Sequence, residues 1–133
     1  MNLTATKPGA LPVLLIEDEA GVMAYVRAAL ERSGYAVVCA KSGAEGVQLL
    51  ESGEFLGIVS DMVTPGGVNG AGVHAWIAQH RPELASRIVF ITGDIANEET
   101  VATLRKTGAP CVEKPFRVQQ FISVVEKTMG KAL

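Results

Sequence analysis

The chain has 133 residues, which is the length of one ordinary domain. Hydrophobic residues make up 48% and charged residues 20%, so the chain is too apolar to be disordered. The 12 Lys and Arg residues against 14 Asp and Glu residues give a net charge of −2, which offers no basic face for nucleic acid. No apolar stretch approaches the roughly 18 residues of a membrane span, so we expect a cytoplasmic protein with no membrane contact of its own.

The two cysteines, Cys39 and Cys111, lie far apart in the sequence and lack the spacing of a zinc site. Each lies in an apolar run. We therefore expect buried, reduced thiols rather than a disulfide, as is usual in the cytosol.

Residues 1–11 show no periodicity and are expected to form a flexible lead-in. After them, short apolar runs alternate with segments in which apolar residues recur at helical spacing. In chain order the pattern predicts a strand at 12–16, a helix that Ser33 and Gly34 end, a strand at 35–40, a helix from the N-cap Ser42 to Ser52 and Gly53, a strand at 55–60, a helix at 71–80, a strand at 87–92, a helix at 98–106 that Gly108 ends, a strand at 110–113 and a helix at 118–129.

Strands that alternate with helices through short loops are typical of a parallel sheet covered on both faces. The apolar runs lack alternation, which favours strands buried on both sides. We therefore predict a single α/β domain over residues 12–130, a doubly wound parallel sheet in three layers. Ligands bind such sheets outside the carboxyl ends of the strands, so the residues that follow each strand are the candidates for function.

Polar residues stand at the carboxyl ends of four of the five predicted strands: Glu17 and Asp18 at the first, Asp61 at the third, Thr92 at the fourth and Lys114 at the fifth. If the first and third strands are neighbours, three carboxylates converge and repel one another unless a cation joins them. Mg²⁺ suits such a set because it prefers oxygen ligands and keeps positions for water and phosphate. The set predicts a phosphoryl-transfer site with Asp61 as the candidate nucleophile.

Each of these residues also has an ordinary structural explanation. An acidic pair after a strand can simply complement the dipole of the next helix, and Asp61 precedes a Pro-Gly turn. A threonine at a strand end often caps a turn, and Lys-Pro is common in loops. Their coincidence at four strand ends favours the functional interpretation.

The segments 14–19, 58–66, 88–94 and 113–116 together resemble the receiver domains of two-component response regulators, and the likeness extends over residues 12–129. The segments 86–94 and 108–116 are most similar to receivers attached to hybrid histidine kinases. The resemblance implies a flavodoxin-like (βα)₅ fold with strand order 2-1-3-4-5.

The resemblance also implies a metal site. Asp18, Asp61 and the backbone carbonyl of Val63 would hold Mg²⁺, and Glu17 would reach the ion through water. No other cofactor is implied.

The resemblance further implies that Asp61 accepts a phosphoryl group from a histidine kinase or a histidine phosphotransfer protein, with Thr92 and Lys114 binding the phosphoryl oxygens. The Lys114-Pro115 peptide would be cis. The downstream partner would be a protein that contacts the face formed by the helix 98–106, the strand 110–113 and the helix 118–129. The chain would be a monomer or weak dimer, and would catalyse only its own phosphorylation and dephosphorylation.

The chain departs from the family pattern at three places. Thr64 stands where receivers usually have methionine or another apolar residue, and the loop 65–70 is one residue longer than the common form. Cys111 replaces the tyrosine or phenylalanine that often lies three residues before the lysine. The usual aromatic reporter of phosphorylation is therefore absent.

Three other functions remain open. A Mg²⁺-dependent phosphatase of the haloacid dehalogenase type would need an acid two residues after the nucleophile, where this chain has Val63. A flavin carrier would need a phosphate loop after the first strand, where residues 17–19 are all acidic. A pseudo-receiver would lack key residues, whereas all five key positions are filled here.

Overall fold

The computed structural model describes residues 11–64 and 67–132. Apart from Leu11, the predicted lead-in 1–11 lies outside the described residues, so its flexibility stays a prediction. Within the described ranges, five strands alternate with five α-helices: β1 (Val13–Ile16), α1 (Ala20–Arg32), β2 (Val37–Ala40), α2 (Gly43–Ser52), β3 (Gly57–Asp61), α3 (Gly70–His80), the 3₁₀-helix η1 (Pro82–Leu84), β4 (Ile88–Thr92), α4 (Glu98–Thr107), β5 (Cys111–Glu113) and α5 (Val118–Met129).

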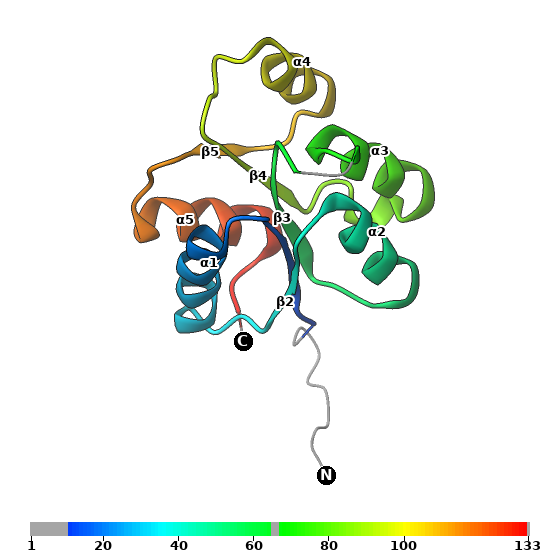
Figure 1. Cartoon of the computed structure of the whole chain (residues 1–133). Helices are drawn as coiled ribbons and strands as arrows, with labels where there is room; N and C mark the ends of the chain where they lie inside the picture. The colour runs from blue at the N-terminus through cyan, green and yellow to red at the C-terminus, as the bar shows by residue number, and fades with distance from the viewer. Residues whose placement is uncertain (1–10, 65–66, 133) are drawn as a thin grey trace.

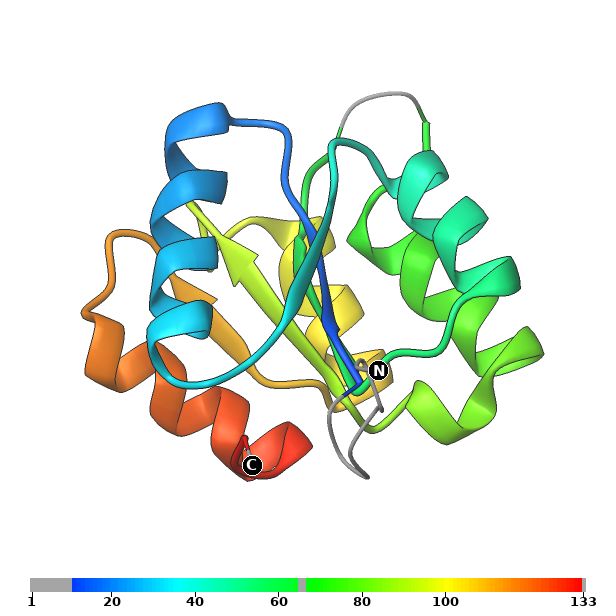
Figure 2. The same cartoon turned by 90° about the horizontal axis from the view of Figure 1, so that it is seen from below.

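The strands form one parallel sheet in the order β2-β1-β3-β4-β5. Helices α1 and α5 cover one face, while α2, α3 and α4 lie on the other (Figures 1 and 2). Because the central strands β1, β3 and β4 are buried on both faces, alternate residues of each of them belong to two separate hydrophobic cores. The predicted three-layer (βα)₅ fold and its strand order are confirmed.

The helix-ending signals in the sequence act as predicted. The Ser42 hydroxyl accepts the N–H of Glu45 at 3.1 Å, and the Glu45 carboxylate reaches back to the N–H of Lys41 at 2.7 Å. Gly108 ends α4 with a φ of +70°, a conformation that side chains with a Cβ seldom adopt. These caps set the start of α2 and the end of α4.

Helix α4 is the least anchored of the helices. Among its residues only Thr100 is buried, whereas α1, α2, α3 and α5 each bury three. Yet α4 is well capped, because Asn97 accepts two N–H bonds at its start and its first and last turns carry charges that complement the helix dipole. Its weak point is therefore packing, not local sequence.

We expect the amides of α4 to exchange with solvent faster than those of the other four α-helices, because little buried apolar surface opposes its opening. Hydrogen exchange followed by mass spectrometry or NMR at fixed pH measures this directly. Helix α5, of similar length but with Phe121, Val125 and Met129 buried, is the internal control. Equal protection of α4 and α5 would contradict the packing argument.

Candidate functional site

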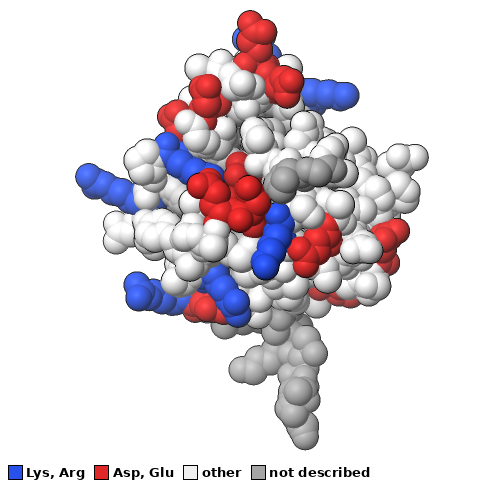
Figure 3. Space-filling view, in the orientation of Figure 1, with Lys and Arg blue, Asp and Glu red and all other residues white. Residues whose placement is uncertain are grey.

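The carboxyl ends of the strands surround an open hollow of about 410 Å³. Figure 3 shows acidic side chains gathered at the centre of this end of the molecule, with Lys and Arg side chains beside them. The charged and hydroxyl residues that line the hollow are Asp18, Glu19, Asp61, Thr92, Asp94, Thr100 and Lys114. The candidates chosen from the strand ends therefore share one place in the fold.

Asp61 is the last residue of β3 and is only 6% exposed. Its Oδ1 accepts the backbone N–H of Val63 at 3.3 Å, and its Oδ2 accepts a bond from Lys114 Nζ at 3.3 Å. The central position of β3, between β1 and β4, places this carboxylate at the middle of the sheet edge. Asp61 is thus buried on the protein side and open toward the hollow.

Glu17 follows β1 and is fully buried. Its Oε2 accepts the N–H of Glu19 at 3.1 Å and its Oε1 accepts a bond from Lys114 Nζ at 3.3 Å. Burial raises the pKa of Glu17, and repulsion from Asp61 adds to the rise, while the Glu19 N–H and Lys114 oppose it. A buried carboxylate beside another one needs a cation.

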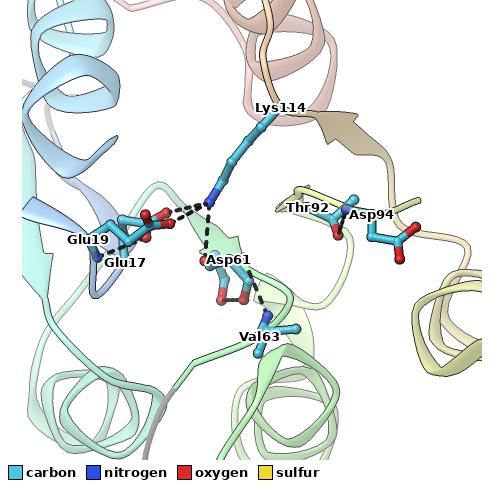
Figure 4. A network of polar contacts seen from close by, with 8 residues as sticks. Glu17, Glu19, Asp61, Val63, Thr92, Asp94 and Lys114 are labelled. Carbon is cyan, nitrogen blue, oxygen red and sulfur yellow. Dashed lines mark hydrogen bonds and ion pairs between the residues drawn. The ribbon is translucent and has the colours of Figure 1, made fainter. Parts of the chain in front are cut away.

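Lys114 supplies that cation. Its Nζ lies 3.3 Å from Glu17, 3.6 Å from Glu19 and 3.3 Å from Asp61, and Figure 4 shows its side chain crossing the hollow to reach them. Burial alone would lower the pKa of Lys114, but attraction to Asp61 and Glu17 outweighs it and the pKa is raised. The lysine is therefore held as a positive charge among negative ones.

Oxygen atoms of Glu17, Glu19 and Asp61 lie within 4.8 Å of one another. Three carboxylates this close form an oxygen-only set that could hold a hard divalent cation. The sequence-predicted Glu17 and Asp61 are brought together. Asp18 lines the same hollow, but among the described residues its carboxylate is not part of this group. Sequence reasoning missed Glu19, although it directly follows the acidic pair.

Thr92 ends β4 and is buried, and its hydroxyl accepts the N–H of Asp94 at 3.1 Å (Figure 4). The backbone N–H of Lys114 donates to the Thr92 carbonyl at 2.8 Å, so β4 holds the lysine in place. The Lys114-Pro115 peptide is cis, as expected. Hydroxyl and ammonium groups therefore flank the carboxylates from the β4 and β5 side.

Cys111 pairs with Phe90 across β4 and β5 and is half-buried, and both cysteines are free. Burial raises the pKa of the Cys111 thiol to about 11, and the charges of Glu113 and Asp61 add to the rise. The thiol is the unreactive form at neutral pH, so this position does not have the character of a redox sensor. Both cysteines are free, as expected, but they are half-buried and not buried, because the strands that carry them lie at the sheet edges.

A (βα)₅ fold with acidic residues at the carboxyl ends of β1 and β3, a threonine at the end of β4 and a lysine after β5 defines a receiver domain of a two-component system. Comparison with known proteins agrees. The model of the family described as "Response regulator receiver domain" matches residues 13–126, and the chain belongs to that family.

Two curated proteins of Brucella abortus (strain 2308) are similar to the chain. The response regulator receiver protein CpdR is 27% identical over 117 residues, which cover 88% of this chain and 95% of CpdR. The sensor kinase CckA is 32% identical over 128 residues, which cover 92% of this chain but only 13% of the kinase. The likeness thus extends to a protein of similar length and to a small part of a much longer one.

Solved structures share the fold. A CheY-like receiver domain protein from Methanospirillum hungatei superimposes with a TM-score of 0.79 at 21% identity, over 90% of this chain and 93% of that one. CheY4 of Vibrio cholerae superimposes with a TM-score of 0.76 at 22% identity, over 89% of this chain and 98% of that one.

No helix in the described part of this chain has the length and apolarity to cross a bilayer.

Proposed function

We propose that the chain is a phosphorylation-controlled switch in which Asp61 is the phosphoacceptor. The observation that carries this proposal is the Asp61 carboxylate itself, buried at its base, open to the hollow, and contacted by Lys114 at 3.3 Å. The partner lysine offsets the charge that a phosphoryl group would bring to this carboxylate. No other described carboxylate combines this burial, this central position and this access.

In the proposed reaction, a carboxylate oxygen of Asp61 forms a bond to phosphorus while the bond between phosphorus and an imidazole nitrogen of the donor breaks. The imidazole leaves with the electron pair of that bond. Lys114 stays within reach of a phosphoryl oxygen on the same carboxylate. The Thr92 hydroxyl, which accepts from Asp94 N–H, keeps its own hydrogen free to donate to a second phosphoryl oxygen.

The carboxylates fit a Mg²⁺ ion by their chemistry, since all the donors are hard oxygens. We propose that Asp18, Asp61 and the Val63 carbonyl hold it and that Glu17 contacts it through water. When bound, Mg²⁺ neutralises negative charge on the transferring phosphoryl group. Glu19 could take the place of Asp18 as a ligand, because its carboxylate lies close to those of Glu17 and Asp61.

The proposed phosphodonor is a histidine kinase or a histidine phosphotransfer protein, and the similarity to part of a sensor kinase supports a donor of this kind. The proposed output is a protein contact through the face of α4, β5 and α5, where α4 buries only Thr100. We propose that phosphorylation shifts this face between two states. We place the chain in the cytoplasm, which its free cysteines favour.

The proposal is tested by incubating the protein with phosphoramidate, whose phosphorus–nitrogen bond resembles that of phosphohistidine, with Mg²⁺ or with EDTA. We expect one phosphoryl group per chain, only with Mg²⁺, and removable by hydroxylamine as an acyl phosphate. Borohydride reduction followed by peptide mass spectrometry locates it. Incorporation at another residue, or none from phosphoramidate and acetyl phosphate alike, would refute the assignment.

The phosphatase alternative requires a general acid two residues after Asp61. Val63 occupies that place, and its side chain is 69% exposed and has no proton to transfer. We therefore propose that the chain catalyses only its own phosphorylation and dephosphorylation. Multiple turnover of a generic phosphate ester such as p-nitrophenyl phosphate would restore the alternative.

We expect the lifetime of the phosphoryl group to change when Val63 or Asp94 is replaced, because both line the hollow and flank the approach of water to Asp61. Val63→Ala and Asp94→Ala, measured by loss of phosphoryl label in Mg²⁺ after the donor is removed, test this. Glu113→Ala is the control, because Glu113 is exposed and does not line the hollow. Identical lifetimes in both variants and the parent protein would disprove it.

A further inference from the structure

The connection between β3 and α3 is closed by two cross-links. The N–H of Gly70 donates to the carbonyl of Met62 at 2.9 Å, and the hydroxyl of Thr64 donates to the carbonyl of Val68. Thr64 is only 8% exposed, so its hydroxyl makes this bond away from bulk solvent. The two bonds hold the short segment 62–64 at both of its ends.

The acceptor of the Thr64 bond is itself fixed. Val68 packs so closely against Gly43, the first residue of α2, that a Cβ on Gly43 would lie 2.2 Å from the Val68 carbonyl oxygen. The carbonyl thus already lies against the first residue of α2. Thr64 is bonded to a loop residue that packs on α2.

The segment held in this way carries the carbonyl group of Val63. On one side of that residue, the Val63 N–H donates to Asp61 Oδ1 at 3.3 Å. On the other side, the peptide that contains the carbonyl joins Val63 to Thr64. Rotation of this peptide is therefore limited by Asp61 before it and by the Thr64 hydroxyl after it.

Thr64 is itself a departure from the family pattern. An apolar side chain, the usual type at this position, could not donate a hydrogen bond to a carbonyl. The Thr64 hydroxyl therefore adds a link between residues 64 and 68 that an apolar residue could not make.

We propose that Thr64 is a positioning residue that orients the Val63 carbonyl for the divalent cation. This inference rests on the proposed function, because it assumes that the Val63 carbonyl is a ligand. Thr64 itself does not touch the ion or the phosphoryl group. Its hydroxyl acts through the Val68 carbonyl to keep the 63–64 peptide in one orientation.

The test compares Thr64→Val, which keeps the shape and removes the hydroxyl, with Thr64→Ser, which keeps the hydroxyl. Mg²⁺ affinity is measured by calorimetry and by the shifts of the Asp61 and Val63 amide resonances, without any phosphodonor. We expect Thr64→Val to weaken Mg²⁺ binding about tenfold, the usual lower bound for losing a group that orients a metal ligand. Thr64→Ser is expected to bind like the parent protein.

Thermal unfolding in EDTA separates orientation from general stability. A purely structural role would lower the melting temperature of Thr64→Val without changing its Mg²⁺ affinity, and that result would overturn the inference. Equal weakening by Thr64→Val and Thr64→Ser would overturn it too. If the parent protein itself failed to bind Mg²⁺, the proposed function would fail first, so the two failures are distinguishable.

Discussion

Replacing Asp61 with asparagine is expected to abolish phosphoryl incorporation from phosphoramidate. The amide keeps the size of the carboxylate and can still accept the Val63 N–H, but it lacks the negative charge that makes the oxygen a nucleophile. Label on the variant is expected to fall below detection in Mg²⁺ at any donor concentration that saturates the parent protein. Intact mass spectrometry over a time course measures it.

Asp94→Asn is the matched control, because Asp94 lines the same hollow as a carboxylate and its Oδ1 accepts the Ala96 N–H at 3.1 Å. It is expected to label at an initial rate close to that of the parent, even where its later loss of label differs. Circular dichroism and thermal unfolding verify that Asp61→Asn is folded. Persistent label in a folded Asp61→Asn, located on Glu17 or Glu19, would move the acceptor to that residue.

The fold could be predicted because the strands are short apolar runs and the helices end at strong signals such as Gly53 and Gly108. The predicted starts of two strands differ from the structure. The apolar pattern predicts strands that include Tyr35 and Phe55, but these residues lie before β2 and β3, although both are almost fully buried. An apolar pattern indicates which residues are buried. In these two segments the buried stretch starts before the first residue that pairs in the parallel sheet. The 3₁₀-helix η1 is too short to show any periodicity.

Trp76 shows the same limit on the helices. It lies at helical spacing from the buried Val73 on α3, yet it is only half-buried, against the α2 and α3 side of the core. Its ring stacks on His80 at 4.5 Å between centroids. Helical spacing locates the apolar stripe, but it does not say how far the sheet extends beneath its edge.

The site was predictable as far as topology determines it. Asp61, Thr92 and Lys114 stand at the carboxyl ends of strands that meet at one edge, so any parallel pairing in this order brings them together. The choice between Asp18 and Glu19 depends on the backbone of the turn after β1 and on where the long Lys114 side chain reaches. Sequence spacing contains neither quantity, which is why Glu19 was missed.

Lys114 carries the second large effect, because it is the described cation that contacts all three carboxylates of the cluster. Lys114→Met keeps a similar side-chain length and removes the charge. We expect the free energy of unfolding to fall by roughly 2 kcal/mol at neutral pH, less than the full cost of breaking a buried pair because the lysine side chain is 19% exposed. Denaturant unfolding in EDTA measures the difference. Lys127→Met, an exposed lysine in the last turn of α5, is the matched control.

The pH dependence of the stability lost in Lys114→Met shows whether the missing charge causes the loss. The folded-state pKa of Glu17 is already raised, chiefly by burial, and without Lys114 it rises further. A raised carboxyl pKa contributes stability that is complete in acid, below the ordinary glutamate value, and is lost as the pH rises through the folded value. The deficit of Lys114→Met is therefore largest near neutrality and shrinks as the pH falls and Glu17 takes up a proton. In the parent protein, the raised pKa of Lys114 gives stability that is present below the ordinary lysine value and is lost above the folded one.

The effect of Mg²⁺ shows whether Lys114 stabilises the fold through its charge or through packing. Under the proposed function, the ammonium group of Lys114 and the divalent ion would both neutralise Asp61 and Glu17 in the parent protein, whereas in Lys114→Met only the ion would do so. Mg²⁺ is therefore expected to raise the melting temperature of Lys114→Met by more than that of the parent, and to leave Lys127→Met with the parent's increment. A deficit that is independent of pH and unaffected by Mg²⁺ would mean that Lys114 stabilises the fold through packing of its aliphatic chain, not through charge.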